Sequence, residues 1–349
     1  MATGISDCRA FLHSTTNMWK IAQGAARGKS HIQQGTPCQD KTYCCQRKGC
    51  TVAALADGAG SAKLSHYGAE VAVEAAALFI SEHFDELYAA ERNEQITAPL
   101  MQHVLQALHV RAQELNCAER DLASTLLVAA LKGCRYLFVH LGDGLIVCSV
   151  VDEAKVASTP ENGEFVNTTI FTTSPNAVEH VRVYRGICTD IRGVLLMSDG
   201  SSTRLYNPRN RAISSALHRL ITTARSMPSG QFEHQLVQTL EHTLQPATTD
   251  DCSMAIVAAD FATDTPFQNL SIEWQATLLK LGLRSSYLPG ALRYYYKVLH
   301  FLRHPRSVAE VAAHMGLRRQ IAGMLLITLM KSKLIRQTDV TFYTLSANI

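Results

Sequence analysis

The stretch TVAALADG at residues 51–58 decides the fold, because six residues of a strand-like, mostly apolar run lead directly into Asp57 and Gly58. A carboxylate at the end of a buried strand is costly to desolvate unless positive charge offsets it. The glycine that follows lets the backbone turn sharply and approach a ligand. This stretch therefore predicts a buried strand whose end carries an acid at a ligand site.

Four other acids have comparable positions in the chain. Asp143 and Asp199 each end an apolar run and precede a glycine, Asp250 lies just before an apolar run, and Asp40 ends the turn GTPCQD. Asp-Gly alone is also a common hairpin signal, so one such pair indicates little. If the five strand ends meet, their oxygens form a site suited to hard divalent cations.

Composition restricts the class of protein. The 349 residues are 47% hydrophobic and suffice for one large and one small domain. The net charge of +3 is too small to indicate nucleic acid or a membrane by itself. No apolar stretch reaches the ~18 residues of a membrane span, and residues 1–20 lack the apolar core of a secretory signal. We expect a cytoplasmic protein with reduced thiols.

Hydrophobic patterning predicts an α+β fold. Strand-like runs and helix-like runs follow one another in blocks, which favours a β-sandwich with helices outside and antiparallel pairing through short turns. The expected elements are a strand, a turn and a strand in 28–57, helices 67–88 and 95–116, strands 126–131, 135–141, 145–151, 181–185 and 194–198, helices 212–225 and 230–244, and a strand 252–259.

The chain divides into four segments by composition. We expect a loosely structured lead-in at 1–20, a main domain at 21–262, a polar linker at 263–285 and a small domain at 286–349. In the last segment, Ser307 to Glu310 fits a capping box, Gly316 breaks the helix, and a second helix and a hairpin follow. This order is typical of a winged helix.

The C-terminal segment has two candidate roles. Basic residues on its second helix and hairpin could contact DNA phosphates. They are Arg318, Arg319, Lys331, Lys333 and Arg336. However, residues 321–330 are apolar nearly all round the helix, and such a helix is normally covered by protein. We favour a unit that docks a protein or dimerises over one that binds DNA.

Taken in order, the acid motifs resemble those of a known family. GTPCQD at 35–40, ADGAG at 56–60, GDG at 142–144, SDG at 198–200 and DDCS at 250–253 are similar to the type-2C, metal-dependent Ser/Thr protein phosphatases, most closely their bacterial branch. The stretch NGEFVNTT at 162–169 also resembles that branch. The resemblance covers about residues 26–260.

The resemblance implies an α-β-β-α sandwich of two antiparallel sheets flanked by helix pairs, with two Mg²⁺ or Mn²⁺ ions at one end. By this resemblance, Asp57 bridges both ions, Gly58 supplies a carbonyl, Asp199 and Asp250 hold one ion, Asp40 contributes partly through water, and Asp143 belongs to a third-ion site. The ions would activate a water molecule for attack on a phosphate ester.

The implied activity is hydrolysis of phosphoserine and phosphothreonine in a phosphoprotein substrate, opposed by a cognate Ser/Thr kinase, with no membrane partner. Through the activated water, the implied catalytic residues are Asp57, Asp199 and Asp250, together with Asp40. The alternative is a weak or inactive phosphatase-like module that binds or regulates, with a DNA-binding winged-helix tail.

Four positions differ from the usual family pattern. Ala59 replaces a frequent histidine, Gly35 a phosphate-holding arginine, Gln39 an acid, and Gly144 a serine. These differences motivate the inactive alternative. The nearest candidates for the missing groups are His31 and His66 for a general acid, and Arg27, Lys29 and Lys63 for phosphate binding.

Overall fold

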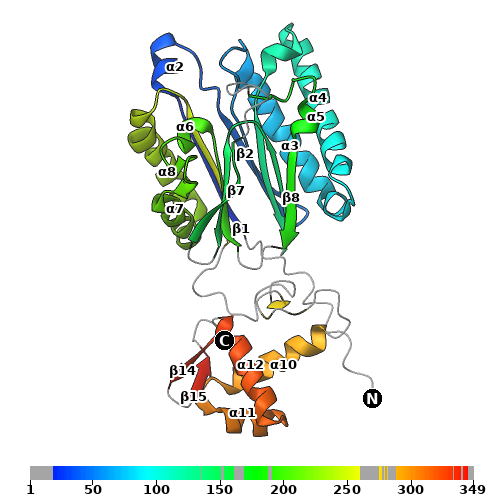
Figure 1. Ribbon diagram of the computed structural model, residues 1–349, viewed down its shortest axis with the longest axis vertical. Coiled ribbons are helices and arrows are strands. Elements are labelled where there is room, and N and C mark those ends of the chain that lie inside the picture. The colour runs from blue at the N-terminus through cyan, green and yellow to red at the C-terminus, as the bar shows by residue number, and fades with distance from the viewer. Residues whose placement is uncertain are drawn as a thin grey trace. The chain divides into compact units, whose positions relative to one another are not determined.

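The computed structural model describes residues 19–133, 135–150, 153–160, 169–187, 191–259, 275–276, 279, 281, 288–332, 334–338 and 341–344 (Figure 1). One compact unit spans Trp19–Asp260, and the described residues beyond it belong to a second unit. Most of the predicted lead-in and linker lies outside the described residues.

The first unit is a sandwich of two five-stranded sheets in which all neighbouring strands are antiparallel. One sheet has the order β1 (Trp19–Ala26), β12 (Cys252–Ala259), β9 (Ile191–Met197), β6 (Leu145–Val150) and β7 (Glu153–Ser158). The other has the order β2 (Lys41–Arg47), β3 (Cys50–Ala56), β4 (Leu126–Lys132), β5 (Arg135–Leu141) and β8 (Arg182–Ile187). The predicted antiparallel sandwich is confirmed.

Helices cover the outer face of each sheet (Figure 1). The β2–β8 sheet packs against α3 (Ser65–Ala89) and α4 (Glu94–Leu115), and the β1–β7 sheet packs against α7 (Ser215–Ser226), α8 (Ser229–Thr239) and the π-helical turn η3 (Leu240–Leu244). Short elements complete the unit: α2 (Lys29–Gln34), η2 (Glu119–Leu122), α5 (Ala177–His180), α6 (Asp199–Ser202), β10 (Tyr206–Asn207), β11 (Ala212–Ile213) and η4 (Gln245–Ala247). None of the described helices is both long and apolar enough to cross a bilayer.

Strand β3 lies at the centre of the core, and all seven of its residues are buried. Val52, Ala54 and Ala56 belong to the apolar cluster shared with α3 and α4, while β12 of the opposite sheet lies against the other face of β3. Because both faces are covered, the strand reads as a continuous apolar run. This packing fixes the position of Asp57, which follows directly.

Of the strands in the two main sheets, β1 and β7 were not predicted from the sequence. Strand β1 begins at Trp19, within the predicted lead-in, and pairs with β12 over its whole length, from Trp19–Ala259 to Ala26–Cys252. Its sequence WKIAQGAA mixes polar and small residues and gives no clear period. Strand β7, EAKVAS, is an edge strand that buries little on its own. Both depend on partners distant in sequence.

The predicted helix 212–225 was wrong at its start. Ala212 and Ile213 form β11, which pairs with β10, and the helix begins only at Ser215. The Ser214 hydroxyl accepts a hydrogen bond from the Ala216 N–H at 3.3 Å. That cap satisfies a free donor of the first turn and sets the boundary.

The second unit contains α10 (Leu288–Phe301), β13 (Arg306–Ser307), α11 (Val308–Met315), α12 (Arg319–Lys331), β14 (Ile335–Thr338) and β15 (Thr341–Thr344), with the sheet order β13-β15-β14. The capping box is present: the Glu310 carboxylate accepts from the Ser307 N–H at 2.8 Å, and the Ser307 hydroxyl accepts from the Glu310 N–H at 3.3 Å. Gly316 ends α11 with a φ of 64°. The helices and the hairpin follow one another in the predicted order.

Close packing at Gly68 of α3 gives a test of this fold. A Cβ at Gly68 would lie 1.9 Å from the carbonyl oxygen of Leu122, whereas one at Gly230 of α8 would meet nothing within 4 Å. We expect Gly68→Ala to lower the free energy of unfolding by about 2–3 kcal/mol, although alanine favours helix. Gly230→Ala should be neutral or raise it by up to about 1 kcal/mol. Urea unfolding of both variants measures this, and an unchanged Gly68→Ala variant would contradict the packing.

Candidate functional site

Strand register brings Asp40 and Asp57 to the same end of their sheet. Strand β2 starts opposite the end of β3, with Lys41 paired to Ala56, so the acids just outside this pair are neighbours. Asp40 is fully buried, and Asp57 is partly accessible to solvent. One acid from the start of β2 and one from the end of β3 therefore face the same region.

The opposite sheet brings two more acids together in the same way. Asp199 follows β9 and is the first residue of α6, and Asp250 lies two residues before β12, which pairs antiparallel with β9. A Cβ on Gly200 would lie 2.1 Å from the carbonyl oxygen of Asp251, so only glycine allows this close approach of the two segments. Asp199 is partly buried and Asp250 is exposed.

The four acids interact electrostatically across the two sheets. Burial raises the pKa of Asp57 well above its usual range, and the charges of Asp40, Asp199 and Asp250 raise it further. Burial is also the largest cause that raises the pKa of Asp40 to about 7, and burial followed by the charge of Asp250 raises that of Asp199 to about 6. These shifts identify one acidic cluster with members from both sheets.

The cluster fits a divalent cation. Both carboxylate oxygens of Asp40 and one of Asp199 are buried without a hydrogen-bond partner, although the hydroxyls of Ser198 and Ser253 are close enough to partly lower the pKa of Asp40. Buried carboxyl groups in a like-charged cluster either hold protons or, when ionised, are stabilised by a cation that offsets their charge. Within the described ranges, no three His, Cys, Asp or Glu side chains are already arranged to hold an ion. Water molecules commonly complete the coordination of Mg²⁺ where few protein ligands contact the ion.

Asp143 lies beside this cluster. It follows β5, and its Oδ2 accepts a hydrogen bond from the Thr169 hydroxyl at 2.7 Å. Its charge contributes to the raised pKa of Asp199, which places it within electrostatic range of that acid. Residues 162–168 of the stretch NGEFVNTT lie outside the described residues, so Thr169 is the part of that stretch that is seen at the site.

Asp251 ties the loops around the cluster together. It is 2% exposed, and its carboxylate accepts hydrogen bonds from the N–H of Gly28 at 2.5 Å and of Gln39 at 2.6 Å. The same carboxylate lies 2.9 Å from His31 Nδ1. Asp251 thus fixes the segments that lead into α2 and into Asp40. The sequence shows two consecutive aspartates here, but their contacts are with segments more than 200 residues away and cannot be predicted from the local pattern.

Thr125 holds the backbone of Asp57 from the opposite side. The Asp57 N–H donates to the Thr125 hydroxyl at 2.9 Å, and the Thr125 N–H donates to the Asp57 carbonyl at 2.8 Å. Thr125 is itself buried. This pair of bonds limits how far Asp57 can move and makes Thr125 a positioning residue that sequence reasoning did not assign.

The departures from the family pattern have local explanations. Ala59 packs with Ala62 and Ala123 in a small apolar cluster. The Gln39 amide donates to the Ser65 hydroxyl at 2.7 Å, which anchors the start of α3. A Cβ on Gly144 would lie 2.8 Å from the Met197 carbonyl oxygen, so this chain has no room there for the usual serine.

The candidate substitutes for the missing groups have structural roles. Arg27 donates to the Thr36 carbonyl at 3.4 Å, and Lys29 donates to the Pro246 carbonyl at 2.6 Å, so both hold the loops beside α2. His31 contacts Asp251, as described above. Burial lowers the pKa of His66, whose Nδ1 is buried without a partner, and Lys63 is exposed. Neither histidine is assigned as a general acid.

Comparison with known proteins gives one family. The model of a family described as protein phosphatase 2C matches residues 27–241, which is more than half of the chain. Serine/threonine-protein phosphatase 3 of Escherichia coli (strain K12) is 28% identical over 173 residues, which cover 48% of this chain and 67% of that protein.

Solved structures of similar proteins include two bacterial phosphatases. Serine/threonine phosphatase Stp1 from Staphylococcus aureus is 14% identical, with a TM-score of 0.48, over 69% of this chain and 95% of that one. The S. agalactiae serine/threonine phosphatase is 15% identical, with a TM-score of 0.47, over 69% of this chain and 99% of that one.

Neutralising an acid of the cluster should stabilise the metal-free protein. Asp199 and Asp40 each have a higher pKa in the folded protein than in the unfolded chain, where it is about 4. The folded protein therefore keeps its full stability below about pH 4. It loses stability as the pH rises through the folded-state pKa of about 6 for Asp199 and about 7 for Asp40. The pKa of Asp57 is raised as well, so in EDTA at pH 8 Asp57→Asn should have a free energy of unfolding about 1–3 kcal/mol higher than wild type, with a smaller difference near pH 4.

A matched variant, Asp85→Asn, should change the stability in the opposite direction. The pKa of Asp85 is lowered, chiefly by hydrogen bonds from Lys132 and Arg135, so Asp85→Asn should be slightly less stable than wild type at neutral pH. Thermal unfolding across this pH range checks both variants. A less stable Asp57→Asn in EDTA at pH 8 would contradict the electrostatic cluster.

Proposed function

This chain belongs to the protein phosphatase 2C family, and we propose that its acidic cluster hydrolyses phosphoserine and phosphothreonine in proteins. One observation carries the proposal. Asp40, Asp57, Asp199 and Asp250 come from both sheets and meet at one end of the sandwich, where burial and the neighbouring carboxylates raise the pKa values of Asp40, Asp57 and Asp199. A like-charged group of this kind is suited to divalent cations, which can also offset the charge of the phosphoryl oxygens during hydrolysis.

The ions that we propose are Mg²⁺ or Mn²⁺, two in number with a third at Asp143. The chain would hold the first two through Asp57, Asp199, Asp250, Asp40 and the carbonyl of Gly58. Bound in this way, the ions supply a water of lowered pKa and offset the charge of the phosphoryl oxygens.

The protein's own contribution is to hold the cluster in place. Thr125 fixes the Asp57 backbone, and Asp251 fixes the loops before α2 and before Asp40. Asp250 is exposed and Asp57 is partly accessible, so solvent and a phosphate ester can reach the cluster from outside. Preorganised carboxylates of this kind lower the cost of assembling the reactive site.

The substrates that we propose are phosphoproteins of the cytoplasm, and the opposing enzyme would be a cognate Ser/Thr kinase. The inactive alternative rests on Ala59 and Gly35, which lack the groups found in many relatives. If the protein is an inactive binding module, it should bind a phosphopeptide in a metal-dependent way without releasing phosphate.

For the C-terminal unit we propose a protein-docking role. Helix α12 exposes Ile321 by 49%, Met324 by 69% and Ile327 by 52%, which form one apolar stripe at helical spacing. The helix carries Arg319 and Lys331 and no acid. Base reading in DNA requires hydrogen-bonding side chains on the exposed face, so this face suits an amphipathic partner helix with acidic flanks.

Metal-dependent turnover tests the enzymatic proposal. Wild type should hydrolyse p-nitrophenyl phosphate with Mn²⁺, and EDTA should abolish this activity. Removal of a residue that hydrogen-bonds to a metal ligand lowers metal affinity or activity about 10–100-fold. Asp57 and Asp199 are proposed as direct ligands, so Asp57→Asn and Asp199→Asn should lower kcat/KM about 100-fold or more. Asp85→Asn is the control with the same chemical change on α3 and should keep full activity. Unchanged activity in Asp57→Asn would refute the assignment.

A designed peptide tests the docking role of α12. A fluorescent amphipathic helix with a leucine stripe and glutamate flanks should bind wild type, Met324→Glu should weaken binding about tenfold or more, and Met324→Leu should preserve it. Fluorescence anisotropy measures the binding. Self-association of the protein through this face, or a gel shift of random duplex DNA that Arg319→Ala removes, would contradict the proposal.

A further inference from the structure

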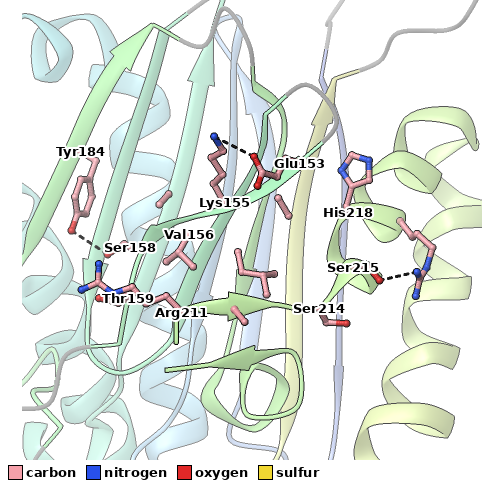
Figure 2. Close-up of a pocket in the computed structure, with 15 residues that line it drawn as sticks. Glu153, Lys155, Val156, Ser158, Thr159, Tyr184, Arg211, Ser214, Ser215 and His218 are labelled. Carbon is pink, nitrogen blue, oxygen red and sulfur yellow. Dashed lines mark hydrogen bonds and ion pairs between the residues drawn. The ribbon is translucent and has the colours of Figure 1, made fainter. Parts of the chain in front are cut away.

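A groove lies along the free edge of β7, away from the acids of the cluster. It encloses about 880 Å³ and is bordered by β7 and the residue after it, by Tyr184 of β8, by β11 and by the start of α7 (Figure 2). None of the acids assigned to the metal site lines it. The groove is thus a separate feature of the sandwich.

One wall of the groove is an edge strand. Among the described residues, β6 is the only strand paired with β7, and β7 is the last strand of its sheet. The outer side of an edge strand presents unpaired N–H and C=O groups that can pair with another extended segment. The nearby strand β11 pairs with β10 and belongs to a separate sheet. The backbone of β7 therefore offers a template for strand addition.

The side chains around this edge are mainly basic and polar. Lys155 of β7, Arg211 beside β11, and His218 and Arg219 of α7 line the groove, and Glu153 is its one lining acid. Glu153 lies 3.3 Å from Lys155 and so offsets only part of this charge. Basic walls favour a segment that carries negative charge.

Hydroxyl groups lie on two sides of the groove, one pair at the end of β7 and one at the start of α7. The Ser158 hydroxyl donates to the Tyr184 hydroxyl at 3.3 Å, and Arg219 donates to the Ser215 hydroxyl at 3.0 Å (Figure 2). Ser158 is buried and its hydroxyl also lies 2.7 Å from His140 Nδ1, so the Tyr184 and Ser215 hydroxyls are the ones that keep capacity to bond with a ligand. The groove therefore combines main-chain pairing along one wall with polar side chains on the others.

The direction of β7 connects the groove with the acidic cluster. Strand β6 begins at Leu145, two residues after Asp143, and its second residue, Ile146, pairs with Ser158 at the end of β7. The Ser158 end of the groove is therefore the end nearer the acids, and the Glu153 end is the farther one. A segment laid along β7 would be led toward the cluster.

We propose that this groove binds an extended acidic segment of the phosphoprotein substrate by addition to β7, an inference that rests on the proposed phosphatase function. Strand addition gives affinity through the main chain, and the basic residues select negative charge. A second copy of this chain would bring an equally basic groove and no complementary charge. The site would determine which phosphoproteins are dephosphorylated without taking part in the reaction.

Direct binding tests the groove independently of catalysis. A short fluorescein-labelled peptide that alternates glutamate with valine should bind the full chain, and added salt should weaken the complex. Lys155→Glu combined with Arg211→Glu should weaken binding about tenfold. Arg209→Glu is the matched control, because Arg209 is exposed on the turn between β10 and β11 but does not line the groove. In the wild-type complex, amide exchange of Glu153–Ser158 should slow.

Kinetics then separate this proposal from the phosphatase proposal. For a phosphoserine peptide with a glutamate-rich flank, the double variant should show KM raised about tenfold with kcat unchanged, while its turnover of p-nitrophenyl phosphate stays at the wild-type level. If the protein turns over neither substrate, the phosphatase proposal fails while the binding test still stands. If the acidic peptide does not bind, or binds equally well to the double variant, the groove is not its site.

Discussion

Repulsion among carboxylates is the physical constraint on which the rest of this structure depends. Asp40 is buried and Asp57 and Asp199 are partly buried, and burial together with neighbouring carboxylates, Asp250 among them, raises the pKa values of these three acids. A fold gains nothing from such a group in isolation, because each acid is desolvated beside others of the same charge. The arrangement becomes favourable when divalent cations occupy it, so part of the stability of the core is coupled to ligand binding.

The sandwich makes this arrangement possible by aligning strand ends. Antiparallel pairing of β2 with β3, and of β9 with β12, delivers one acid from each strand or its adjoining turn to the same end of the two sheets. Asp251 and Thr125 then hold the loops through hydrogen bonds to backbone groups. The helices outside cover the apolar faces and leave this end accessible. Rigid strands thus position the acids, and loops fixed by hydrogen bonds refine their places.

The acids and the central strands could be predicted because their signals are local. A continuous apolar run that ends in Asp-Gly, as at Asp57, has few other interpretations when several such runs occur in order. Strands β1 and β7 could not be predicted, since each gains its stability from a partner and not from its own pattern. The hydrogen bonds of Asp251, and the walls of the groove beside β7, involve segments that are far apart in the chain. Such contacts depend on the fold, and no hydrophobic periodicity in the sequence predicts them.

The central claim is that acids distant in sequence surround a pair of divalent cations. A crystal structure determined in the presence of Mn²⁺, with the ions located from their anomalous scattering, tests it most directly. We expect two strong peaks in contact with the carboxylates of Asp57, Asp199 and Asp250. Carboxylates that stay apart, with no peak between them at saturating Mn²⁺, would contradict it.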